Sequence, residues 1–249
     1  MILKQKQIGY GALIVSGVLA LILILGIPPI SQSQEYHNFF DTHTFLSIPN
    51  FWNVVSNLPF MFVGVFGLWN LKFTGKYKVQ YLSLFIGIVL VALGSGYYHI
   101  NPNNTTLIWD RLPMAMVFMS LTSVVISQFI NFEIGKKLLL PLVLMGVVSV
   151  LYWAFFDNLK PYVLVQFYPM LAIPIILLTF KSKAHTVYGY WYLMLAYVIA
   201  KVFEYFDGQI FNIISYVSGH SLKHIISAFG LLILLYSYFK KNENTIVFK

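Results

Sequence analysis

Eight long apolar stretches divide this chain, and they restrict it to a fold made of membrane-spanning helices. A helix needs about 20 apolar residues to cross roughly 30 Å of hydrocarbon, and each stretch is close to that length. The chain is 59% hydrophobic and only 10% charged, unlike a water-soluble domain. We therefore predict an all-α polytopic membrane protein. The predicted spans are at about residues 8–28, 51–70, 79–99, 110–130, 138–156, 163–180, 187–206 and 218–239.

The first span differs from the seven that follow it. Lys4 and Lys6 precede it, and its apolar part is long for a cleaved signal peptide, so we expect a retained signal anchor. The expected fold is thus a seven-helix transmembrane core plus one extra N-terminal transmembrane helix. The predicted divisions are the signal-anchor helix at 1–29, an outer segment at 30–50, the core at 51–239 and a cytoplasmic tail at 240–249.

The lysines predict which end of the bundle faces the cytoplasm, because cytoplasmic loops of membrane proteins are enriched in Lys and Arg. Twelve of the 16 basic residues fall at the termini and in alternate loops, at Lys4, Lys6, Lys72, Lys76, Lys78, Lys136, Lys137, Lys181, Lys183, Lys240, Lys241 and Lys249. Eight spans then leave both termini inside. Because this positive charge is scattered over short loops, we do not predict nucleic-acid binding. We infer no protein partner from the sequence.

Three histidines are predicted to meet at the outer face. His99 ends one span, while His220 and His224 open the last one and share a helix face at their spacing of four. Neutral imidazole is a good zinc ligand, and a catalytic zinc keeps three protein ligands and an open position for water. The chain has no cysteine, so thiolate sites are excluded. We predict Zn²⁺ as the cofactor, held by these three residues.

The remaining histidines, His37, His43 and His185, lie in predicted loops. We interpret all three as solvated residues without a role in metal binding.

Two polar residues near the predicted metal ligands are candidates for catalysis. Asp110 begins the span after His99, where a carboxylate can cap the helix and can also act as general base and general acid. Ser95, one turn before His99, could hydrogen-bond a substrate carbonyl or a developing oxyanion. It could also serve helix packing, since Ser and Gly are common where membrane helices meet.

Two carboxylates at the end of the predicted span 187–206 are candidates to support the metal ligands without binding the metal. Asp207 could orient a liganding histidine through its second ring nitrogen, as carboxylates often do at metal sites. Glu204 is a second such candidate, although it could simply pair with Lys201, three residues before it.

The motifs Ser95-x-x-x-His99, Trp-Asp110-Arg-Leu-Pro-Met and His220-x-x-x-His224 resemble those of the alkaline ceramidases. These enzymes belong to a membrane hydrolase superfamily that also includes the adiponectin-receptor-like proteins. The likeness covers residues 50–239, and Phe51-Trp-Asn-Val-Val-Ser-Asn57 also resembles a signature of the family. It implies hydrolysis of the ceramide amide to a sphingoid base and a fatty acid. By that resemblance the three histidines bind zinc, Asp110 handles protons and Ser95 assists at the oxyanion.

Two features depart from the resembled family. Its members carry a calcium-binding acidic cluster before the first core span, whereas this stretch offers only Glu35, Asp41 and Asn50, which weakens the case for Ca²⁺. The extra first span and the preference for Lys over Arg favour a bacterial protein. We expect it in the inner membrane, with the site near the periplasmic face and a membrane lipid as its partner and substrate.

Two other functions fit parts of the pattern. A seven-helix lipid receptor, or a lipid-binding membrane protein, would use the zinc structurally, and Ser95 and Asp110 argue against this because neither is needed to hold a metal. A haem or proton carrier would need histidines facing each other across the bilayer, whereas these lie at one face.

Overall fold

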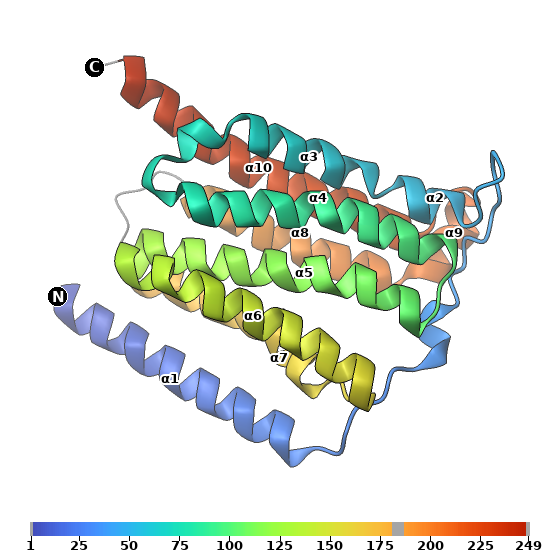
Figure 1. Cartoon of the computed structure of the whole chain (residues 1–249), viewed down its shortest axis with the longest axis horizontal. Helices are drawn as coiled ribbons and strands as arrows, with labels where there is room; N and C mark the ends of the chain where they lie inside the picture. The colour runs from blue at the N-terminus through green and yellow to red at the C-terminus, as the bar shows by residue number, and fades with distance from the viewer. Residues whose placement is uncertain (1, 181–186, 248–249) are drawn as a thin grey trace.

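The computed structural model describes residues 2–180 and 187–247 and shows an elongated helical bundle (Figure 1). The described residues form no β-strand beyond an isolated bridge between Phe45 and Ile48. The main helices are α1 (Ile2–Gly26), α2 (Phe51–Val55), α3 (Leu58–Trp69), α4 (Lys78–Ile100), α5 (Asn104–Val125), α6 (Phe132–Phe156), α7 (Lys160–Thr179), α8 (Val187–Tyr205), α9 (Asp207–Ile214) and α10 (Gly219–Val247). Short helical turns, Gln34–His37, Leu71–Tyr77 and Ile126–Ile130, complete the chain's regular structure. The predicted all-α fold is confirmed.

Seven spans of the described residues are long and apolar enough to cross a membrane, which makes the chain a multi-pass membrane protein. They correspond to the predicted spans other than 187–206. That stretch is helix α8, which lies along α10 in the bundle but carries five tyrosines, Lys201 and Glu204. The span beginning at Phe51 is divided, because α2 ends at Val55 and α3 starts at Leu58.

The structure corrects the predicted start of the span at Asp110. Helix α5 begins six residues earlier, at Asn104, and the Asn103 side chain accepts hydrogen bonds from the backbone amides of Thr105 and Thr106. Because Asn103 caps the helix, the capping role considered for Asp110 is wrong. Asp110 instead lies in the second turn, with its side chain buried.

Helices α4 and α5 approach each other closely along the centre of the bundle. A Cβ atom at Gly94 would meet the backbone of Trp109, so only glycine permits this approach, whereas Gly96 faces open space. Farther along the pair, Gln80 donates hydrogen bonds to the Ser123 and Ser127 hydroxyls. Small residues and buried hydrogen bonds are the usual means of joining membrane helices.

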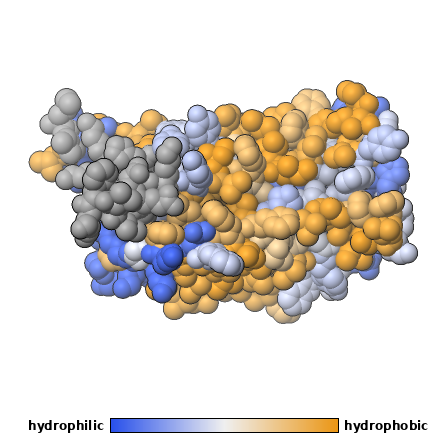
Figure 2. Space-filling model, turned by 90° about the horizontal axis from the view of Figure 1, so that it is seen from above, coloured by the Kyte–Doolittle hydropathy of each residue, from blue (hydrophilic) through white to orange (hydrophobic). Residues whose placement is uncertain are grey.

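Helix α1 lies at the edge of the bundle, along α7 (Figure 1). The Tyr168 hydroxyl donates to the Leu13 carbonyl over 2.9 Å, and the rings of Tyr10 and Phe180 meet edge to face. Most of its other apolar side chains are exposed, as expected of a helix that faces lipid. Figure 2 shows a broad apolar surface between more hydrophilic ends.

The two ends of the bundle differ in what they carry. The start of α1 and the end of α10 lie at one end in Figure 1, with the turn Leu71–Tyr77, which carries Lys72 and Lys76, and the start of α6, which carries Lys136 and Lys137. The α4–α5 turn, the start of α10 and the segment 30–50 lie at the other end. The predicted residues Lys181, Lys183 and His185 lie outside the described part of the chain.

Candidate metal centre and its cavity

Three buried histidines meet at the end of the bundle opposite the termini. His99 lies in the last turn of α4, and His220 and His224 lie on the first two turns of α10. One ring nitrogen from each can be chosen so that all three lie within 4.8 Å of one another. In the described residues this is the only such group of three or more His, Asp or Glu side chains.

The hydrogen bonds of two of the three rings fit a bound metal ion. The Nδ1 atom of His99 is buried without a hydrogen-bond partner, which is costly unless a ligand engages the ring. The Nδ1 atom of His224 lies 2.8 Å from the Ser56 hydroxyl, which leaves its Nε2 atom available. Three neutral imidazoles, one of them fixed through its second nitrogen, are a typical zinc donor set.

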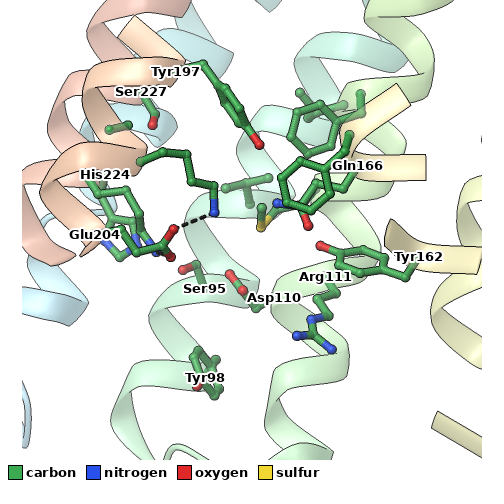
Figure 3. Close-up of a pocket in the computed structure, with 18 of the residues that line it drawn as sticks. Ser95, Tyr98, Asp110, Arg111, Tyr162, Gln166, Tyr197, Glu204, His224 and Ser227 are labelled. Carbon is green, nitrogen blue, oxygen red and sulfur yellow. Dashed lines mark hydrogen bonds and ion pairs between the residues drawn. The ribbon is translucent and has the colours of Figure 1, made fainter. Parts of the chain in front are cut away.

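Ser95 and Asp110 lie beside this group and share its cavity (Figure 3). Ser95 is one helical turn before His99 on α4, and it lines the same part of the cavity wall as Asp110 of α5. Both side chains are buried. The close α4–α5 contact at Gly94 brings the two residues together, although they are distant in the sequence.

Asp207 holds His220 in a different way from the one predicted. Its carboxylate accepts a hydrogen bond of 2.6 Å from the backbone amide of His220 rather than from the ring. The predicted orientation of a ring nitrogen by Asp207 is therefore corrected: the residue fixes the first turn of α10. Ser56, rather than Asp207, contacts a ring nitrogen of a predicted ligand, and that ligand is His224.

Glu204 pairs with Lys201, as the sequence suggested, and also with Lys223. Lys223 lies one turn from His220, and its Nζ atom is 2.9 Å from Glu204 and 3.1 Å from Nε2 of His220. Sequence reasoning missed Lys223 and Ser56. Lys223 lies within the His220-x-x-x-His224 motif, and Ser56 lies within the Phe51–Asn57 signature. Their places inside these motifs were the sequence signal that could have identified them.

The outer segment covers the metal centre. The Phe39 ring lies 4.7 Å from the ring of His99 and 4.5 Å from that of His220, between centroids. His37 is half-buried, and its two ring nitrogens contact the Tyr98 hydroxyl and the Asn104 amide oxygen. The prediction that His37 is solvated is therefore wrong, while His43 is exposed.

The three candidate calcium ligands have separate surroundings. Glu35 is exposed, whereas Asp41 is buried and bonds the ring of His43 over 2.8 Å. The Asn50 side chain donates a hydrogen bond to the backbone carbonyl of His99. Asp41 and Asn50 thus help to order the outer segment, and calcium binding stays an untested prediction.

A cavity of about 460 Å³ extends from the metal centre into the bundle. Its wall comes from the outer segment and from helices α3, α4, α5, α7, α8 and α10. Phe167 of α7 lines it and is also 44% exposed, so part of the cavity wall is formed by a side chain at the surface of α7. Figure 3 shows the polar side chains of α4, α5, α7 and α8 that face it.

A sequence model of the ceramidase family matches residues 43–243. The chain belongs to the ceramidase family. The match includes the metal centre, Ser95, Asp110 and all the core helices, whereas α1 lies outside it. No curated protein matches the chain in a direct sequence comparison. Membership of the ceramidase family supports a hydrolase that acts on a lipid within the membrane.

Proposed function

We propose that this ceramidase-family chain hydrolyses the amide bond of ceramide-type lipids, and that His99, His220 and His224 hold a zinc ion for the reaction. The observation that carries the proposal is the opening of the three buried histidines into a cavity with Ser95 and Asp110 at the same end. A histidine site with catalytic neighbours fits an enzyme better than a structural metal.

The cavity suits an amphiphile. Lining residues run from Ile88 to His99 on α4 and from His220 to Leu231 on α10, and 11 helical residues extend roughly 16 Å. Most polar members lie toward the metal end, and the deeper wall is mainly apolar, with residues such as Val91, Val117, Leu121, Met170 and Leu193. An amide placed beside the histidines would therefore leave an alkyl chain in the apolar part.

Asp110 is proposed to move the proton in this reaction. When bound, zinc would supply Lewis acidity, which polarises a carbonyl and lowers the pKa of a water molecule. The Asp110 carboxylate accepts the proton of the attacking water and returns it to the amine nitrogen as the C–N bond breaks. The products are then a fatty acid and a sphingoid base.

Ser95 is proposed to assist at the carbonyl oxygen. In the proposal, its hydroxyl donates to the neighbouring Asp110 carboxylate while that group is charged, since both side chains line the cavity. Once Asp110 has taken a proton, the hydroxyl can turn to the oxygen on which negative charge develops. On another side of His220, Lys223 contacts its ring and is itself held by Glu204.

The proposed activity can be tested on purified protein by metal analysis and by measuring the amine released from a long-chain ceramide. We expect about one zinc per chain, because three histidines and a water complete a tetrahedral site. An analogue with the amide carbonyl reduced to a methylene should release no amine. Zinc-loaded protein that released no amine from any lipid amide would contradict the proposal and favour a receptor with a structural metal.

We further propose a bacterial inner-membrane protein with the metal centre near the periplasmic face and α1 retained as an anchor. The lysines at the opposite end of the bundle support this orientation. The tail at 240–249 would then be cytoplasmic.

A single cysteine at an exposed position of the α4–α5 turn tests the orientation, because the native chain has no cysteine. Thr105→Cys should react with a membrane-impermeant maleimide in intact cells. The matched variant Lys137→Cys, exposed at the lysine-rich end, should react only after permeabilisation. The opposite pattern would reverse the proposed topology.

A further inference from the structure

Arg111 is a buried cation of the cavity that the proposed reaction does not use. It is the only arginine in the sequence, and the other 15 basic residues are lysines. Its side chain is on α5, directly after Asp110, and only 6% of the residue is exposed. A chain that uses lysine everywhere else thus has arginine at one buried position in the wall of its cavity.

The surroundings of Arg111 leave part of its guanidinium unpaired. The group lies 4.2 Å from the Trp153 ring centroid and 4.9 Å from that of Tyr162. Its Nη2 atom donates to the Gln32 side-chain oxygen over 2.6 Å, whereas its buried Nη1 atom has no hydrogen-bond partner. In the described residues no carboxylate forms an ion pair with it.

A buried guanidinium with a free N–H group is suited to bind an anion. Burial of an unpaired charge is unfavourable, and an oxyanion that accepts its hydrogen bonds would remove that penalty. Arginine differs from lysine in presenting a planar fork of donors and in stacking on aromatic rings. Both properties are used here, because the group lies against the rings of Tyr36, Trp153 and Tyr162, while its buried Nη1 atom still lacks an acceptor.

The position of Arg111 in the cavity indicates which part of a lipid it would meet. Ser31 and Ser33 of the outer segment line the cavity with it, at the end where the metal centre lies. Figure 3 shows Asp110 between Arg111 and His224. Arg111 points away from the histidines, toward Trp153 of α6 and Tyr162 of α7. A lipid amide at the histidines could therefore place its head group at Arg111.

We propose that Arg111, with Ser31 and Ser33, forms a subsite for an oxyanion, such as a phosphate, on the head group of the lipid amide. The inference rests on the proposed function, because it names the class of substrate that the same cavity takes. It makes Arg111 a residue that determines specificity rather than one that takes part in bond cleavage.

The single arginine permits a direct binding test on the full-length purified protein. An arginine-selective dicarbonyl such as phenylglyoxal should reach Arg111 through the cavity that this residue lines, with labelling followed by peptide mass spectrometry. Absence of labelling in the lipid-free protein would also contradict a subsite that a ligand can enter. Ceramide 1-phosphate should slow this labelling at least tenfold more than neutral ceramide with the same chains. Equal protection by the two lipids, or equal protection by inorganic phosphate at the same concentration, would overturn the head-group subsite.

A second measurement does not depend on the reactivity of Arg111. The ratio of the dissociation constants for neutral ceramide and ceramide 1-phosphate is compared between the native chain and Arg111→Met. Arg111→Met should reduce the preference for ceramide 1-phosphate by about 10- to 100-fold, which is the usual effect of losing a hydrogen bond to a charged group. Lys160→Met, which removes a cation outside the cavity at the same end, should leave the ratio unchanged. An unchanged ratio in Arg111→Met would show a purely structural cation.

Failure of the proposed function would look different from failure of the subsite. Amine release from neutral ceramide is measured in parallel on the native chain. If no amide is cleaved but the phosphate lipid still protects Arg111, the subsite stands and the hydrolase proposal fails. If ceramide is cleaved and neither binding test shows a preference, only the subsite is refuted.

Discussion

Asp110→Asn should slow ceramide hydrolysis by about 10² to 10⁴-fold while zinc remains bound. Asparagine keeps the size of the side chain and can still accept a hydrogen bond from Ser95. It cannot take the proton of the attacking water or return it to the leaving amine. Turnover and zinc content are measured on the same purified sample, so that a lost metal is not mistaken for lost proton transfer.

The chain offers a matched control for this substitution. Asp157 is a carboxylate at the same end of the bundle that does not line the cavity, and Asp157→Asn should retain native turnover. If Asp110→Asn itself kept near-native turnover with zinc present, the proposed proton transfer would be wrong. A receptor with a structural metal would then explain the histidines better.

Alanine at both His220 and His224 should remove the zinc and all zinc-dependent activity, because a single histidine is left of the three ligands. Both histidines are buried on one face of α10, so their removal could disturb the packing of this helix. Circular dichroism therefore checks that the variant keeps its helical content. His99→Ala should also lose both metal and activity. Metal content is the decisive measurement in each case.

His43→Ala is the matched histidine control for the metal experiment. This residue is in the same outer region but is exposed and contacts Asp41 rather than the metal centre. It should keep about one zinc per chain. A double variant of His220 and His224 that retained the native zinc content would refute the proposed ligand set.

The fold and the meeting of the histidines were predictable because both follow from long-range regularities of the sequence. Apolar length determines the spans, and counting spans places His99, Asp110 and His220 at one end. The start of α5 was predicted too late because the prediction followed the change in hydropathy near Asp110. The side-chain cap at Asn103 is an equally strong signal for a helix start, and it lies before Asp110 in the chain.

The partners of individual side chains were less predictable. Asp207 and Ser56 lie within reach of α10, and only the packing of helices decides that the carboxylate meets a backbone amide while the hydroxyl meets an imidazole. The same is true of His37, whose contacts to Tyr98 and Asn104 depend on the path of the outer segment. Sequence spacing gives no information about that path.

The route by which substrate reaches the histidines would determine how turnover depends on substrate. Phe39 lies over His99 and His220, while Phe167 of the cavity wall is exposed on α7. Under the proposed function, Phe39 would cover these histidines from the end of the bundle, and the lipid would enter the cavity from the bilayer beside α7. Encounter with substrate is then a lateral, two-dimensional process. Turnover at subsaturating substrate would follow the mole fraction of ceramide in the bilayer, and adding inert phospholipid at constant total ceramide would dilute the substrate and slow the enzyme.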